Sequence, residues 1–486
     1  MTSVTSEIPA QLKRNSVGLA SAVIMSAAIM GPAVSTFFNP QFSTPFSGEA
    51  TPFVYVACLL VMLVTASGVM EMAAVAPSCG SFYTYVSLGL GPTMGFVAGG
   101  LMFVAYALLP PIEIALIGAY LQQTIKQAFD INIPWILISI LPWIGMTALA
   151  LEGIRSTLRT AMTLFILEVA IVLLMAVIVI ASGGAHGISA APLTPSASPS
   201  GFQGLVTGGV FAALSFVGFE GATTLGEEVR RPRRNIPLAI ALSTLAVGVI
   251  YIFCIWAEVI GLGAEKVAAL TGSSTPWNDL AVTYAPWMTP LIIVASVSSM
   301  AAVMVNGNTG VVRILFAMGR ERLLPSSLAY VNGERGTPTN AVYFQSIFSA
   351  LVVVAVGAVS GGLANPDGGS NVYGYCGFLL TLAILLVYIL ANLAAIAFFR
   401  RRGDAKILRQ AVLPALGIAL IGGLFFAQII EQTDPPYTWM PWLIVGWLVA
   451  VAAGAMWLRF NQPDVLAKAG AILAPEDHEV ALGETR

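Results

Sequence analysis

The chain has 486 residues, of which 57% are hydrophobic and only 9% are charged, and its mean hydropathy is +0.85. Soluble domains carry roughly 25% charged residues, so this composition indicates a polytopic membrane protein without a large soluble domain. It leaves little room for the chemistry of an aqueous enzyme. The net charge of −2 says nothing about partners, and we expect no nucleic-acid partner.

The apolar segments are long enough to cross a bilayer, because a spanning helix needs about 20 residues. We predict twelve spans, at about 17–38, 52–76, 93–124, 134–151, 158–181, 204–226, 236–262, 287–316, 340–361, 372–399, 411–430 and 438–459. They form one transmembrane domain, residues 16–460, with short tails at 1–15 and 461–486. The predicted fold is therefore all-α and polytopic.

The placement of lysine and arginine predicts the orientation, since cytoplasmic loops carry an excess of both residues. If the N-terminus is cytoplasmic, only Lys126 and Lys266 of the 22 basic residues fall on the outer side. We therefore expect both termini in the cytoplasm and the protein in the plasma (inner) membrane. The first 15 residues are polar, so no cleavable signal peptide is expected.

Two spans that lie five apart contain helix breakers near their centres. The first span reads Ile29-Met30-Gly31-Pro32-Ala33, and a proline there removes a backbone donor. The sixth span has Gly218 and Gly221 on either side of Glu220. Matched interruptions are typical of transporters with two inverted halves. We predict a 5+5 repeat, with spans 1–5 at about 17–181 and spans 6–10 at about 204–399, followed by two further helices at about 411–459.

The same region carries a family resemblance. Three segments resemble the sixth-span signature of the amino acid–polyamine–organocation permeases: Gly218-Phe219-Glu220, Gly226-Glu227-Glu228 and Arg231-Pro232-Arg233-Arg234-Asn235-Ile236-Pro237. The segments 77–85 and 313–325 are similar to further parts of that family. The resemblance implies alternating-access transport of amino acids or amines, and no cofactor.

An opened helix frees amides that favour anions and carbonyls that favour cations. Relatives that carry amino acids usually read Gly-x-Gly at the first interruption, where this chain has Gly31-Pro32-Ala33. Because Pro32 has no N–H, we expect a weakened carboxylate site and favour amines, as in the putrescine importers that this region resembles. The candidate substrate-binding residues are Ile29, Met30, Gly31, Pro32, Ala33, Glu113, Phe216, Gly218, Phe219 and Glu220. For the two phenylalanines, ordinary packing is the alternative.

Glu113, Glu168 and Glu220 lie mid-span with no basic residue at the same depth. Such a carboxylate is protonated or meets a cation, which here is a substrate ammonium, H⁺ or Na⁺. The family resemblance places Glu168 where some proton-coupled members have a lysine, with Ser298 and Ser299 beside it. We predict proton coupling through Glu168 or Glu220. The alternatives are a protonated Glu168 bonded to a neighbouring helix, and serines bonded to their own helix.

The remaining charged residues, cysteines and histidines give weaker indications of function. Glu227 and Glu228, beside Arg230 and Arg231, form either an inner gate or a solvated cluster. For the near-end residues Glu71 and Glu258, snorkelling or interfacial water is the preferred explanation. We expect no metal site, because the four cysteines (Cys58, Cys79, Cys254 and Cys376) lack a ligand spacing and His186 and His478 lie outside the spans.

Two other functions remain open at this stage. An exchanger that swaps an amino acid for its decarboxylated amine has the same sequence features as an importer. A membrane sensor that binds amines without transporting them is the alternative from another class. The sequence does not distinguish a monomer from a homodimer.

Overall fold

The computed structural model describes residues 17–78, 80–268, 276–333, 335–403, 406–430 and 435–467. Within these ranges every regular element is a helix, and the β pairings are two isolated bridges. Among the described residues, eleven helices are long and apolar enough to cross a membrane, and α10 (Gly201–Ser215) is apolar but shorter. The all-α polytopic fold is thus confirmed, and α10 with the chain after it would complete the predicted twelfth span. The predicted tail 1–15, Cys79 and His478 lie outside the described residues.

The long helices agree with the predicted spans to within a few residues. They are α1 (Leu19–Met30) with α2 (Pro32–Phe37), α4 (Thr51–Val75), α6 (Pro92–Ala107) with α7 (Leu109–Phe129), α8 (Trp135–Glu152), α9 (Ile154–Ala181), α11 (Pro232–Leu262), α14 (Thr289–Arg320), α15 (Thr339–Ser360), α16 (Pro366–Arg402), α17 (Leu413–Ile430) after a π-helical turn (Leu408–Val412), and α18 (Met440–Asn461).

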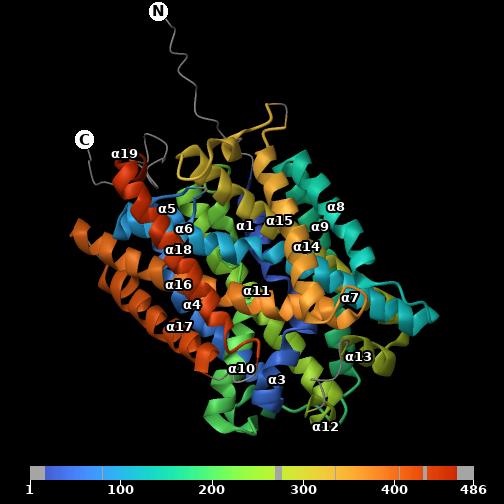
Figure 1. Ribbon diagram of the computed structural model, residues 1–486. Helices are drawn as coiled ribbons and strands as arrows, with labels where there is room; N and C mark the ends of the chain where they lie inside the picture. Colours follow the sequence, from blue (N-terminus) through green and yellow to red (C-terminus); the bar gives the residue numbers. More distant parts are fainter. Residues whose placement is uncertain are drawn as a thin grey trace, which may run out of the picture.

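Short helices between the spans were not anticipated from the sequence. They are α3 (Pro40–Ser47), α5 (Phe82–Leu90), α12 (Ala264–Ala268), α13 (Pro276–Tyr284) and α19 (Pro463–Ala467). Helices α5 and α19 lie at one end of the bundle, and α3 and α12 lie at the other (Figure 1). Loop helices of this kind lack the long apolar run that predicts a span.

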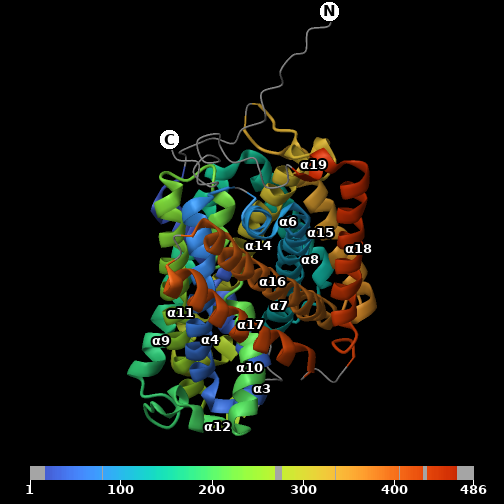
Figure 2. The ribbon, with the colours of Figure 1, turned by 90° about the vertical axis from the view of Figure 1, so that its left-hand side faces the viewer.

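The bundle is built around α1, which packs against α9, α11 and α14. Helices α17 and α18 lie on the outside (Figure 2), and they keep large apolar side chains exposed, including Phe426 and Trp442. Exposed apolar surface of this kind suits contact with lipid, because hydrocarbon does not penalise it.

Basic residues gather where α11 begins and where α14 and α16 end, which we call the basic end. Several hydrogen bonds join the connections there. Arg401 donates to the carbonyls of Leu88 and Gly89 in α5 at 2.8 and 2.6 Å, and Tyr83 donates to Glu321. The basic end is therefore a packed layer of loops from several spans.

Candidate functional site

The first span is interrupted at Gly31. This residue adopts a left-handed conformation, φ 57° and ψ 77°, that ends α1, and Pro32 then starts α2. Both choices follow from backbone chemistry, because glycine tolerates positive φ and proline suits the first helical position. The freed carbonyl of Met30 accepts hydrogen bonds from Ser35 Oγ at 2.7 Å and from the Tyr251 hydroxyl at 2.5 Å.

The sixth span is interrupted directly after α10. Residues 216–220 form irregular turns before a 3₁₀ helix, Gly221–Leu225. Gly218 has φ 105°, and a Cβ atom there would overlap the side chain of Ile29. The two predicted interruptions therefore meet in the structure, and glycine allows their close approach.

The carbonyl ends of both half-helices converge on one hydroxyl. Tyr251 of α11 lies 2.5 Å from the Met30 carbonyl oxygen and 2.7 Å from the Ser215 carbonyl oxygen, each at the last residue of its helix. Such helix C-termini carry partial negative charge and favour cations. Sequence reasoning did not identify Tyr251, because it stands in an ordinary apolar run of α11.

The amide ends are occupied by serine hydroxyls. The Val34 amide in the first turn of α2 donates to Ser299 Oγ at 3.0 Å, and the Ala222 amide donates to Ser26 Oγ at 2.8 Å. Pro32 has no amide hydrogen to offer. Few backbone donors therefore remain at the interruptions for a substrate carboxylate.

Glu220 is held by two tyrosines. Its Oε1 accepts from the Tyr106 hydroxyl at 2.7 Å and its Oε2 accepts from the Tyr388 hydroxyl at 2.8 Å, and the side chain is fully buried. Phe219 packs beside Tyr388 with ring centroids 5.0 Å apart, which is ordinary aromatic packing. Neither tyrosine was identified from the sequence.

Glu113 and Glu168 lie near one another, on α7 and α9. Both are buried, and within the described chain neither Oε2 of Glu113 nor either oxygen of Glu168 has a hydrogen-bond partner. Ser299 lies close to Glu168 without hydrogen-bond geometry to it. Ser298 instead donates to the Leu164 carbonyl of α9 at 3.1 Å.

The interpretation of Glu258 as a residue at an interface with water is wrong. Its side chain is 1% exposed, and neither of its oxygens has a partner among the described residues. Trp277 of α13, also buried, lies close to this carboxylate. Glu71 is half-buried and accepts from Gln410 Nε2 at 2.6 Å.

The acidic pair after the sixth span contacts α14. Glu228 forms a bidentate pair with Arg313, and Glu227 forms one with Arg320. Glu228 is 1% exposed, so the alternative of a solvated cluster is wrong for this residue. Arg230 and Arg231 are exposed and do not supply these pairs.

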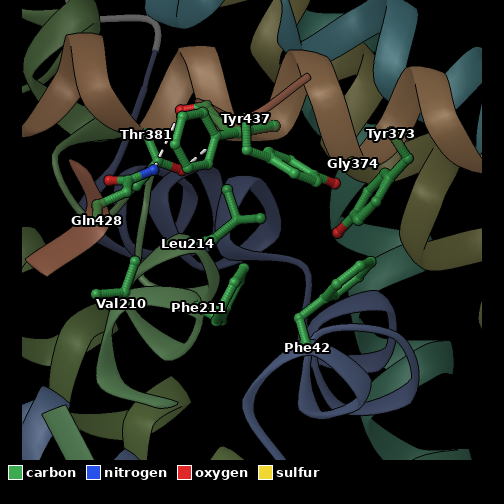
Figure 3. A pocket seen from close by; sticks show the side chains of 11 residues that line it. Phe42, Val210, Phe211, Leu214, Tyr373, Gly374, Thr381, Gln428 and Tyr437 are labelled. Atoms are coloured by element: carbon green, nitrogen blue, oxygen red, sulfur yellow. Dashed lines mark hydrogen bonds between the residues drawn. The ribbon is translucent and has the colours of Figure 1, made fainter. Parts of the chain in front are cut away.

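Near the opposite end, Asn39 links three elements. Its Oδ1 accepts from the Tyr373 hydroxyl at 2.7 Å, and its Nδ2 donates to Ser215 Oγ at 2.8 Å. Tyr373 also lines an apolar cavity of about 30 Å³ with Phe42, Phe211 and Tyr437 (Figure 3). That volume suits one water molecule and not a substrate. Burial raises the pKa of Tyr437 to about 12, so it stays neutral there.

A helical bundle whose two interrupted helices meet at its centre has the architecture of a membrane transporter. The family model described as amino acid permease matches residues 17–464. The chain belongs to this family of the amino acid–polyamine–organocation superfamily and is a permease, as the sequence resemblance predicted.

The relatives differ in what their names say they carry. The low-affinity putrescine importer PlaP of Escherichia coli (strain K12) is 26% identical over 422 residues, covering 85% of this chain and 88% of PlaP. The branched-chain amino acid permease BcaP of Lactococcus lactis is 24% identical over 455 residues, covering 87% and 92%. The chloroplastic cationic amino acid transporter 7 of Arabidopsis thaliana is 24% identical over 335 residues, covering 64% and 55%.

Proposed function

We propose that this permease is a secondary active importer of a small organic amine, driven by protons. The observation that carries the proposal is the asymmetry of the two interruptions. Their carbonyl ends converge on Tyr251, whereas the amides of Val34 and Ala222 donate to Ser299 and Ser26. An ammonium group matches carbonyl ends, and a carboxylate requires free amides.

This arrangement favours one kind of relative over another. The name of PlaP gives putrescine as its substrate, which carries ammonium groups and no carboxylate. The name of BcaP gives branched-chain amino acids, which carry both an ammonium group and a carboxylate. The capped amide ends support the amine. We therefore assign substrate contact to the Met30 and Ser215 carbonyls. We add Phe216, which packs against Tyr251, and Phe219, which packs against Tyr388.

The buried carboxylates supply the charge that a transported cation requires. Glu113 and Glu168 have oxygens without partners in the described part of the chain, and a buried carboxylate needs a proton or a cation. Both oxygens of Glu220 already accept tyrosine hydroxyls. Glu168 is therefore our first choice for the proton site, with Glu113 as its neighbour.

Alternating access requires contacts that break in turn at the two ends. We propose that spans 1, 2, 6 and 7 move against the others. The pair of Glu228 with Arg313 joins span 6 to span 8, and the bond of Tyr373 with Asn39 joins span 10 to span 1. With the basic end in the cytoplasm of a plasma-membrane protein, the first contact is the inner gate and the second is the outer gate.

Uptake into proteoliposomes tests the proposal with one matched pair, an amino acid and the amine left by its decarboxylation. We expect preference for the amine and faster uptake with an inward proton gradient. Preference for the amino acid would show that the interruptions hold a carboxylate and would overturn the assignment. An exchanger would be identified by amine uptake that requires amine or amino acid inside the proteoliposomes and does not respond to the proton gradient.

A further inference from the structure

A large apolar cavity lies outside the transport core. Its volume is about 540 Å³; it is lined by α6, α14, α15, α18 and the loop after α14, and it is open on one side, where Phe344 and Ala450 are exposed. Aromatic side chains line it, among them Phe103, whose ring lies 6.2 Å from that of Phe344 and 6.1 Å from that of Trp447. Gly454 of α18 and Gly99 of α6 leave the space open. The volume is that of a typical small-ligand site.

The cavity continues into a polar mouth at the basic end. A second, shallower and more open cavity of about 430 Å³ shares Leu324 and Pro325 with the first. Its lining adds Arg322, Gln462 and Trp457, and the Trp457 side chain is 56% exposed. Exposed tryptophan is typical of the level of the lipid headgroups. An apolar interior thus opens beside a cation where the helices leave the membrane.

Arg322 is positioned by the end of α14. Its amide donates to the Gly319 carbonyl at 3.1 Å, and the next amide, of Leu323, donates to the Met318 carbonyl at 2.9 Å. These two bonds form a turn that commonly ends helices. Its first residue after the helix has a left-handed backbone and is usually glycine, but here it is Arg322, with φ 62°. Its side chain is exposed and forms no ion pair or hydrogen bond within the described part of the chain.

We propose that this composite cavity binds an anionic phospholipid from the leaflet at the basic end. An acyl chain occupies the apolar cavity, and the phosphate group contacts Arg322 in the mouth. The two cavities match the two parts of such a molecule, since a free phosphate would leave the aromatic interior unfilled. The site is separate from the helix interruptions and does not depend on the proposed substrate.

Native mass spectrometry of the purified full-length protein in detergent tests this site by titration with two lipids. Phosphatidylglycerol is anionic and phosphatidylcholine is zwitterionic, and both carry the same acyl chains. We expect the first bound phosphatidylglycerol to be favoured, and Arg322→Gly to weaken it about fivefold, the effect of one arginine near an anionic surface. Binding of phosphatidylcholine should change less, because its choline cation offsets the charge of its phosphate. Glycine suits the left-handed turn, so this variant is expected to keep its fold.

A second variant tests the apolar part. Ala450→Trp fills the cavity from the exposed face of α18 and should weaken the first molecule of both lipids. Arg459→Gln, on α18 at the same end but outside both cavities, is the matched control and should leave binding unchanged. The proposal is overturned if Arg322→Gly keeps the full preference for phosphatidylglycerol. It is also overturned if Ala450→Trp binds like the parent protein, or if the cavity is covered by a second copy, seen as a dimer that Ala450→Trp dissociates.

Discussion

Arg313 and Glu228 form a buried bidentate ion pair between span 8 and the end of span 6. Arg313 Nε lies 2.8 Å from Glu228 Oε2, and Arg313 Nη2 lies 3.1 Å from Glu228 Oε1. The two side chains are 8% and 2% exposed. Arg313 also donates to the Thr309 carbonyl of its own helix at 3.3 Å, which fixes the guanidinium. The pair therefore joins span 6 to span 8, which belong to the two groups of spans that we propose to move apart during transport.

Removing one member of this pair should destabilise the state that is closed at the basic end. Arg313→Gln leaves Glu228 buried without its partner, and such changes lower the free energy of unfolding by about 3 kcal/mol. We expect a lower Tm in detergent and a marked loss of uptake. In the double variant Arg313→Gln with Glu228→Gln, part of the lost stability should return, because no unpaired charge remains.

The second pair on the same helix provides the control. Arg320 Nη2 lies 2.7 Å from Glu227 Oε1, but the Glu227 side chain is 21% exposed. Water can therefore solvate the carboxylate when the ion pair is lost. Glu227→Gln should lower the free energy of unfolding by about 1 kcal/mol or less. Equal losses of Tm from Arg313→Gln and Glu227→Gln would contradict the special role of the buried pair.

The serines that cap the amide ends should control the choice between amine and amino acid. The double variant Ser26→Ala with Ser299→Ala frees the amides of Ala222 and Val34 for a substrate carboxylate. We expect the preference for the amine over the matched amino acid, measured as a ratio of uptake rates, to fall about tenfold, the effect of one hydrogen bond to a charged group.

Ser296→Ala is the matched control for that experiment. Ser296 is on the same helix as Ser299, but its hydroxyl donates to the Ile292 carbonyl of its own helix at 2.9 Å. Its removal should leave the ratio of uptake rates unchanged. An unchanged ratio in the double variant as well would mean that the amides of the interruptions do not contact the substrate.

The sequence predicts the fold well because the signals are local. Apolar runs define the spans, and the breakers Gly31-Pro32 and Gly218 mark the interruptions that the structure brings together. The resemblance around 218–237 identified the family correctly. These features depend on backbone chemistry and on hydrophobic length, both of which can be read along the chain.

The partners of the charged residues could not be predicted in this way. Glu220 meets Tyr106 and Tyr388, which come from two other spans, and Glu228 meets Arg313 rather than the neighbouring arginines. Such contacts depend on the rotation and depth of each helix in the bundle. A buried tyrosine in an apolar run has no local mark that distinguishes it from packing, and Tyr251 was missed for this reason.

The tyrosine pair around Glu220 predicts how that carboxylate contributes. Tyr106→Phe and Tyr388→Phe each remove one hydroxyl donor to a buried carboxylate, and each should lower the free energy of unfolding by about 2 kcal/mol. Thermal unfolding in detergent measures this effect. Tyr375→Phe, at a half-buried tyrosine that packs against Tyr437, is the control and should change Tm little. A Tm unaffected by Tyr106→Phe would show that the hydroxyl is not bonded to a carboxylate in the resting protein.

Glu168→Gln should separate transport from its driving force. A glutamine has nearly the shape of the glutamate but cannot take up and release a proton, so amine uptake should no longer respond to an inward proton gradient. In the parent protein, a gradient of one pH unit supplies about 1.4 kcal/mol per proton and should raise accumulation up to about tenfold. Exchange of labelled for unlabelled amine, which needs no gradient, should persist in the variant. Glu71→Gln is the matched control, because Glu71 is half-buried and its carboxylate accepts a hydrogen bond from Gln410. If Glu168→Gln keeps the full response to the gradient and Glu220→Gln loses it, the proton site lies at Glu220 and the unpartnered oxygens of Glu168 have a structural role.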